Sequence, residues 1–155
     1  VHSGKKLKIK FEVDINPPLK FQTESKTLLL PKTFNVITMT LPNLYAGKMH
    51  AVLCRKWASR VKGRDWFDFE WYVKRNTPLN LTHLQERMYE SGDLNKDIIL
   101  DKKIFKELMY KRIDELAVDG AIKEVSPFIK DKSGFEFWSK EYFKLLVDRV
   151  LFDNI

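Results

Sequence analysis

Two short stretches carry acidic and basic side chains at spacings suited to binding a metal ion and phosphate. Residues 6–18 read KLKIKFEVDINPP. As a strand, this stretch places Glu12 and Asp14 on one face about 7 Å apart, since a strand rises about 3.4 Å per residue. That separation suits two oxygen ligands of one hard cation. A solvated sheet face explains the alternation equally well, with Lys8, Lys10, Glu12 and Asp14 facing water and Ile9, Phe11, Val13 and Ile15 facing the core.

The second stretch, KGRDWFDFEWY, adds two carboxylates beside an arginine. Asp65 and Asp68 are three residues apart, so both lie on one face of a helical turn next to Arg64. A structural explanation is that Asp65 caps the helix while Asp68 faces the positive end of its dipole. That explanation leaves the setting unaccounted for, in which Arg64 adjoins the pair and a long basic helix comes just before it.

A basic region precedes these acids. Residues 48–64 contain no Asp or Glu, and their cations are Lys48, Arg55, Lys56, Arg60, Lys62 and Arg64. Lys48, Arg55 and Ser59 lie at i, i+7 and i+11, which places them on one stripe of a helix. Such a stripe, flanked by carboxylates, suits a triphosphate with its metal ion, whereas a solvated helix face explains the same charges.

Other chemistries have little support. Neither Gly-x-x-x-x-Gly-Lys nor Gly-x-Gly-x-x-Gly occurs, and no Ser/His/Asp set follows from the sequence. The three histidines are far apart and suggest no zinc spacing. The single cysteine, Cys54, lies in the apolar pattern AVLCRKW, which favours a buried side chain over a nucleophile.

Strands come first in the predicted order of elements, and helices follow. Apolar patterning predicts strands over 5–15, near Thr27–Leu30 and over 34–41, and helices over 43–61, 65–74, 82–89, 101–118 and 137–151, with 121–134 irregular. We predict an α+β fold in which a short N-terminal sheet, residues 1–42, precedes a predominantly helical domain, residues 43–155. So few strands need other elements to cover them.

The composition is that of a well-packed protein with anionic partners. Apolar residues make up 44% of the 155 residues and aromatic residues 13%, and the net charge is +7. The charge favours nucleic acid, nucleotides or an acidic protein as partners. No apolar run is long enough to span a membrane, and the sequence has no apolar leader and no cysteine pair, so we expect a cytoplasmic location.

The combined motifs resemble a known family. KLKIKFEVDINPP, followed by AGKMHAVLCRKWASRVKGRDWFDFEWYV, is similar to the AbiEii/AbiGii bacterial nucleotidyltransferases, the toxin halves of abortive-infection toxin–antitoxin systems. The similarity runs from about residue 5 to 75. It rests on K-[IL]-x-[FL]-E-[IV]-D, a lysine followed by a basic helix, and K-G-R-D-x-[FY]-D taken together.

The resemblance implies a small sheet like that of DNA polymerase β, with acidic residues that bind Mg²⁺ and a nucleoside triphosphate. The strand KIKFEVD matches one acidic strand of that sheet, the helix lysine matches Lys48, and the R-D-x-x-D element begins at Arg64. The implied catalytic residues are Asp14, Lys48, Asp65 and Asp68, the metal ligands are Glu12 and Asp14, and the phosphate-binding residues are Lys10, Arg55 and Arg64.

One family element is absent from these residues. The family carries G-[GS]-x…D-x-D, which occurs nowhere in this sequence. Metal-assisted transfer normally needs carboxylates that hold two ions about 3.5–4 Å apart. We therefore expect the C-terminal portion of a longer enzyme, or a degenerate copy, and expect this chain alone to be inactive.

Two functions follow as alternatives. The first is part of a nucleotidyltransferase that transfers a nucleotide from a nucleoside triphosphate to an acceptor such as tRNA or protein. The second is a non-catalytic helical domain whose C-terminal helices bind an antitoxin or another protein, with the basic face serving solubility.

Overall fold

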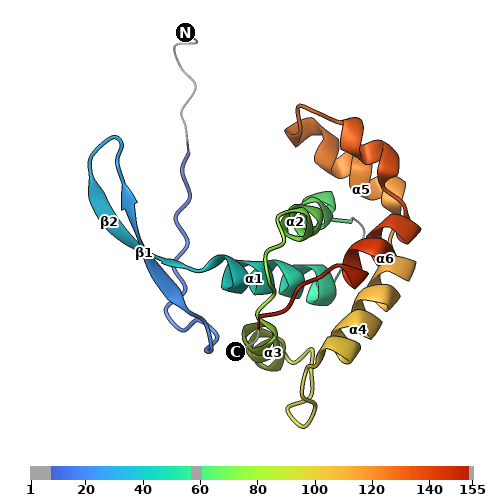
Figure 1. Cartoon of the computed structure of the whole chain (residues 1–155), viewed down its shortest axis with the longest axis horizontal. Coiled ribbons are helices and arrows are strands. Elements are labelled where there is room, and N and C mark those ends of the chain that lie inside the picture. Colours follow the sequence, from blue (N-terminus) through green and yellow to red (C-terminus); the bar gives the residue numbers. More distant parts are fainter. Residues whose placement is uncertain (1–7, 57–60, 154–155) are drawn as a thin grey trace.

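The computed structural model describes residues 8–56 and 61–153 and has the predicted α+β order. Two strands, β1 (Thr23–Leu28) and β2 (Phe34–Met39), form an antiparallel hairpin in which Thr23 pairs with Met39 and Leu28 with Phe34. The hairpin projects to one side of the helices (Figure 1). The second strand is close to its predicted range, whereas the first begins earlier than predicted.

The strand predicted over 5–15 is wrong for the part that the structure describes. Residues 8–14 are extended but pair with no described strand, and residues 15 and 16 form a bend. Ile9, Phe11, Val13 and Ile15 are 68%, 87%, 83% and 94% exposed. The alternating pattern is present, but a strand requires hydrogen bonds to a neighbour, and the described sheet has only β1 and β2.

The helices form the body of the molecule (Figure 1). Their ranges are α1 (Leu41–Cys54), α2 (Gly63–Lys74), α3 (Leu81–Ser91), α4 (Lys102–Asp114), α5 (Val118–Val125) and α6 (Lys140–Asp148), with 3-10 turns at Ser126–Phe128 and Ser133–Phe137. Helix α1 ends before residue 61, the predicted end, and α5 replaces part of the predicted irregular segment. Trp57 and Ser59 lie outside the described residues.

Local signals explain several helix ends. Asn80 and Asp101 each accept a hydrogen bond from the backbone N–H three residues later, and Gly92 takes the left-handed conformation after α3. Thr40 is the residue before α1, and its side chain makes no capping hydrogen bond. Asn43 is buried and donates through its side-chain amide to the carbonyl of Gln22.

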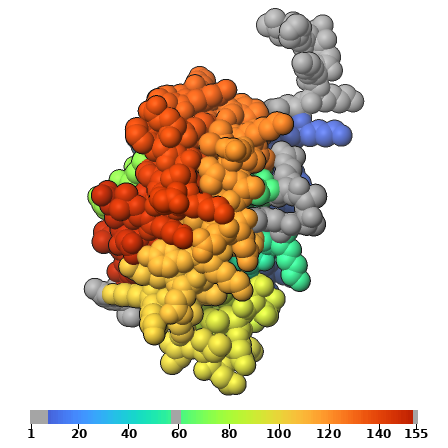
Figure 2. All heavy atoms as spheres, turned by 90° about the vertical axis from the view of Figure 1, so that its right-hand side faces the viewer, coloured from blue at the N-terminus to red at the C-terminus, as the bar shows by residue number. Residues whose placement is uncertain are grey.

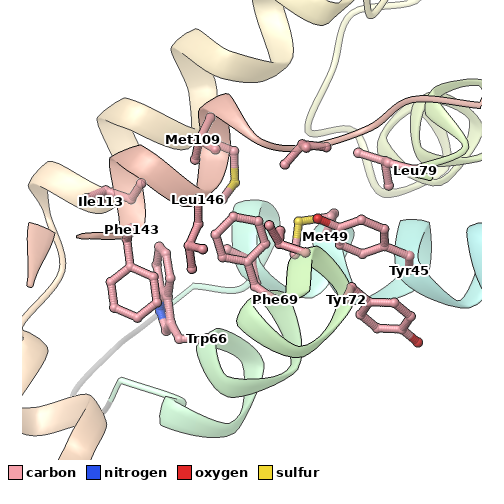
Figure 3. Close-up of a cluster of buried hydrophobic side chains, with 14 of the residues drawn as sticks. Tyr45, Met49, Trp66, Phe69, Tyr72, Leu79, Met109, Ile113, Phe143 and Leu146 are labelled. Atoms are coloured by element: carbon pink, nitrogen blue, oxygen red, sulfur yellow. The ribbon is translucent and has the colours of Figure 1, made fainter. Parts of the chain in front are cut away.

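Aromatic residues of α2 and α6 dominate the core (Figure 3). The rings of Trp66 and Phe143 lie 5.0 Å apart between centroids, and Phe69 stacks on Phe143. From α1, Tyr45 and Met49 are fully buried, and Tyr45 stacks on Tyr72 of α2 with 4.5 Å between the ring centroids. Helix α2 therefore contributes a large share of the buried aromatic side chains of this core.

The C-terminal helices close one side of this core. In Figure 2, residues of α4, α5 and α6 cover one face together. After α6 the chain runs back to the start of α3. There the Leu79 N–H donates to Leu151 O over 2.8 Å, and the Asp153 N–H donates to Leu79 O over 3.0 Å. These contacts attach the end of the described chain to the start of α3.

Buried amides and a histidine join the segment before the hairpin to the helices. The Asn80 side-chain amide donates to Asn43 Oδ1 over 2.7 Å, and His83 Nδ1 lies 2.8 Å from the carbonyl of Leu19. A carbonyl only accepts, so Nδ1 carries the proton. This network fixes the hairpin on α1 and α3. The division into domains after residue 42 stays a prediction, and it falls two residues inside α1.

Candidate functional site

Two ion pairs join α1 to α2 at the surface. Lys48 Nζ lies 2.6 Å from Asp68 Oδ2, and Arg55 Nη1 donates to Asp65 Oδ2 over 2.6 Å. We call these four residues the ion-pair array. Lys48 and Arg55 of the predicted stripe thus face Asp65 and Asp68 of the predicted acidic turn. Arg55 directly follows the end of α1, and Ser59 of the stripe lies outside the described residues.

The apolar faces of the two helices position this array. Met49 and Val52 on α1 are fully buried, as are Trp66 and Phe69 on α2. Lys48 and Arg55 therefore point out of the core, and their side chains remain 46% and 45% exposed. Cations with this exposure can exchange a protein carboxylate for a ligand's phosphate at small cost.

Asp65 is the buried member of the array. Its side chain is 10% exposed, and it lies at the third residue of α2, not at the predicted cap position. Burial raises the pKa of Asp65 above its usual value, and the nearby Arg55 and Lys48 charges lower it, so burial has the larger effect. Arg55, with Lys48 nearby, therefore holds the Asp65 carboxylate in a partly desolvated position.

Hollows open on two sides of the array. The larger, of about 660 Å³, is lined by Lys48, Arg55 and Asp65 together with His83 and Arg87 from α3. The smaller, of about 430 Å³, is lined by the whole array and by Arg64, with Phe67, Val125, Phe128 and others forming its apolar side. Both have cationic and apolar walls, a combination suited to a phosphorylated ligand with a flat or sugar-like body.

Arg64 is positioned from α5. Its backbone N–H donates to Glu124 Oε2 over 3.3 Å, and its guanidinium lies 5.0 Å from the ring centroid of Phe128. The neighbouring Gly63 allows this approach, because a Cβ there would come within 2.0 Å of the Ala121 carbonyl oxygen. The predicted phosphate-binding arginine thus lines the same hollow as the ion-pair array.

The early charged residues lie elsewhere. Lys10 forms an ion pair with Glu12, and Asp14 Oδ1 accepts the backbone N–H of Asn16 over 3.0 Å. All three are exposed, and none lines either hollow. Among the described residues, no hydrogen bond or ion pair connects them to α1 or α2. Their assignment to metal and phosphate stays a prediction that this geometry does not support.

A comparison with protein families decides the chain's family. The model described as "Nucleotidyl transferase AbiEii toxin, Type IV TA system" matches residues 2–146. The chain belongs to the AbiEii family. Comparisons with curated proteins and with solved structures gave no significant match. The family match confirms the resemblance and extends it through the helical part of the chain.

Two residues of this AbiEii-family site were missed by the sequence reasoning. His83 is fully buried, and its Nε2 has no hydrogen-bond partner among the described residues. Burial lowers its pKa, so the ring presents an uncharged acceptor. Arg87 lies one turn further along α3, with its guanidinium carbon 4.0 Å from a Cβ placed on Gly47. Their i, i+4 spacing in THLQERM was the available signal, but it predicts a shared face only.

The described residues do not fit a complete Mg²⁺ site. Mg²⁺ prefers six oxygen ligands in near-octahedral geometry. Asp65 and Asp68 each already contact a cation, and Glu12 and Asp14 are exposed outside the hollows. The array can neutralise phosphate and hold its cations in place, and no step through a metal follows from it.

No described helix is long and apolar enough to cross a bilayer.

Proposed function

We propose that the ion-pair array binds the phosphates of a nucleoside triphosphate, and that the chain forms part of an AbiEii-family enzyme that transfers a nucleotide to an acceptor. The observation that carries this proposal is the pairing of Lys48 with Asp68 and Arg55 with Asp65 between two hollows. Such a site is charge-balanced before binding, and each cation exchanges one oxygen anion for another.

Each residue of the array has a distinct role in this proposal. Lys48 supplies a compact charge and Arg55 a planar donor fork, and both contact phosphate oxygens. Asp65 and Asp68 are positioning residues that orient these cations. Arg64 extends the cationic wall into the smaller hollow. In this proposal Mg²⁺ enters with the nucleotide, since it commonly binds through substrate phosphates and one or two carboxylates.

The acceptor is proposed to be tRNA or a protein, as the basic region over residues 48–64 suggests. RNA binding driven by phosphate contacts weakens steeply with salt. An RNA affinity that falls steeply with salt, with a slope reduced by Lys48→Ala or Arg55→Ala, supports an RNA acceptor. Absence of RNA binding at low salt argues for a protein acceptor or for the non-catalytic alternative.

That alternative, a helical domain that binds an antitoxin or other protein, has one favourable observation. Phe137 and Leu145 beside and on α6 remain 61% and 49% exposed. Exposed apolar side chains of this size are common at protein interfaces. Loss of partner binding in Phe137→Ser and Leu145→Ser, with unchanged nucleotide binding, would assign this surface to a partner.

A thermal-shift experiment tests nucleotide binding by the array. A ligand that binds only the folded state raises the melting temperature with its concentration. We expect at least one of ATP, GTP, CTP and UTP to do so, and Lys48→Ala to remove the shift. Lys144→Ala is the matched control, because Lys144 is 41% exposed and pairs with Asp114 over 2.7 Å. No shift with any of the four nucleotides would overturn the proposal.

Nucleotide transfer by this chain alone is not expected. Incubation with labelled nucleoside triphosphate, Mg²⁺ and either RNA or protein should leave the acceptor unlabelled, since the described carboxylates do not complete a metal site. Robust Mg²⁺-dependent labelling would show that the described set of residues is sufficient for catalysis.

A further inference from the structure

A second cluster of side chains lies at the far end of α1. His50 and Cys54 are four residues apart, so they share one face of the helix. Asp93 joins them from the segment just beyond α3, where Gly92 in the left-handed conformation turns the chain back. One ligand atom from each of the three residues lies within 4.8 Å of those of the others.

The geometry of the cluster is close to that of a metal site. His50 Nε2 is 3.9 Å from Asp93 Oδ2, and the Ser91 hydroxyl lies 3.0 Å from the former and 2.5 Å from the latter. In a tetrahedral zinc site, bonds of about 2.0–2.3 Å place neighbouring ligand atoms about 3.3–3.8 Å apart. The three ligand atoms lie within 4.8 Å of one another, so any two of them need to approach by about 1.5 Å at most.

The donor types select the metal. A thiolate and an imidazole together favour zinc and similar borderline or soft transition metals, whereas Mg²⁺ prefers oxygen ligands alone. This site is therefore chemically distinct from the Mg²⁺ that the family resemblance implies. It contains none of the catalytic, metal-binding or phosphate-binding residues predicted from the sequence. It also does not depend on the proposed nucleotide function.

We propose that His50, Cys54 and Asp93 bind one transition-metal ion of the zinc class, with the Ser91 hydroxyl or a water molecule as fourth ligand. The ion would fasten the C-terminal end of α1 to the turn after α3. It would also lie beside the larger hollow, which all four residues line. A metal here would stabilise the wall that carries Lys48 and Arg55.

The surroundings allow entry of an ion. Cys54 and Asp93 also line a separate hollow of about 290 Å³, so the cluster is reachable from two sides. Arg87 and Arg112 flank the cluster, and their charges oppose a dication. Arg112 is held by the carbonyls of Val52 and Arg55, which directs its guanidinium to the backbone.

Cobalt substitution tests the site directly. Titration of the reduced, metal-free chain with Co²⁺ should give a thiolate-to-cobalt charge-transfer band with 1:1 stoichiometry, and Zn²⁺ should remove it by displacement. Cys54→Ser should abolish the band. His50→Ala and Asp93→Asn should each weaken Co²⁺ binding at least about tenfold, since even loss of an outer partner commonly costs 10–100-fold. Glu90→Gln, an exposed change on α3, should leave it unaltered.

A second readout requires no variant. Cys54 is the only cysteine in the sequence, so mass spectrometry reports its alkylation without ambiguity. Bound Zn²⁺ should slow alkylation by iodoacetamide and raise the melting temperature. Absence of the cobalt band together with unchanged alkylation would overturn the proposal, as would a band that survives both His50→Ala and Asp93→Asn.

Discussion

Arg55 Nη1 lies 2.6 Å from Asp65 Oδ2, and the two side chains differ in exposure, with Arg55 45% exposed and Asp65 10% exposed. The pair therefore joins a solvated cation to a desolvated anion. Such an arrangement suits ligand binding better than stability, because the cation can turn to a phosphate whereas the carboxylate stays in place.

Asp65→Asn should stabilise the protein at neutral pH. Burial raises the pKa of Asp65 in the folded state, so ionisation of this carboxyl costs more in the folded protein than in the unfolded chain. The wild type therefore loses stability as the pH rises from the unfolded-state pKa of Asp65 through its folded-state pKa. The neutral variant does not show this loss. We expect a gain on the order of 0.5–2 kcal/mol in the free energy of unfolding at pH 7.

The pH dependence of this gain provides the check. Denaturant unfolding of wild type and variant should differ above the folded pKa and should converge below the unfolded pKa, where Asp65 is protonated in both states. Asp114→Asn, an exposed change, should alter stability by less than about 0.5 kcal/mol. A less stable Asp65→Asn variant at pH 7 would show that the contact with Arg55 outweighs burial.

Gly63→Ala should destabilise the fold. A Cβ at this position would lie 2.0 Å from the backbone oxygen of Ala121, so α2 and α5 would have to separate. Overpacking of this kind costs about 1–3 kcal/mol or more, which exceeds the higher helix propensity of alanine. Gly134→Ala meets no atom within 4 Å and serves as the control. Equal melting temperatures for the two variants would contradict the close approach.

Glu70→Gln should weaken the attachment of α2 to the C-terminal segment. Glu70 is buried and accepts hydrogen bonds from Trp138 Nε1 over 3.0 Å and from Tyr142 Oη over 2.5 Å. An amide has one acceptor atom, so one donor would lose its partner at a cost of about 1–3 kcal/mol.

Chemical denaturation and near-ultraviolet circular dichroism would measure this loss. The Trp138 environment should change in Glu70→Gln but not in Glu141→Gln, which alters an exposed residue of α6. Unchanged stability in Glu70→Gln would mean that a water molecule accepts the hydrogen bond of the released donor in place of the lost carboxylate oxygen.

The sequence predicted which residues share the faces that form the ion-pair array, but it predicted neither their pairing nor the lack of a neighbour for the early strand. Spacings of seven and three residues place Lys48 with Arg55 and Asp65 with Asp68 on single faces, because helical geometry depends on local sequence. The alternating pattern of residues 8–15 predicts which side chains share a face. It does not supply the neighbouring strand that would make those residues part of a sheet.

The missed residues show the same limit. His83 and Arg87 reach the larger hollow only because α3 packs against α1, and Asp93 reaches Cys54 only because Gly92 turns the chain back. The three histidines have no metal-ligand spacing in the sequence, although His50 and Cys54 share a helix face. Their third potential ligand lies 39 residues beyond Cys54, and only the fold brings it near.

Calorimetric titration with a nucleoside triphosphate tests the central claim most directly. Two double variants are compared, Lys48→Ala/Arg55→Ala and Lys106→Ala/Lys144→Ala. Each removes two positive charges, and Lys106 and Lys144 also pair with carboxylates, over 2.8 and 2.7 Å. Long-range electrostatics are thereby matched. Two lost charge-assisted hydrogen bonds should weaken binding by about 100-fold or more in the first variant. The second variant should bind like the wild type. Equal affinities in the two double variants would contradict a phosphate site at the ion-pair array.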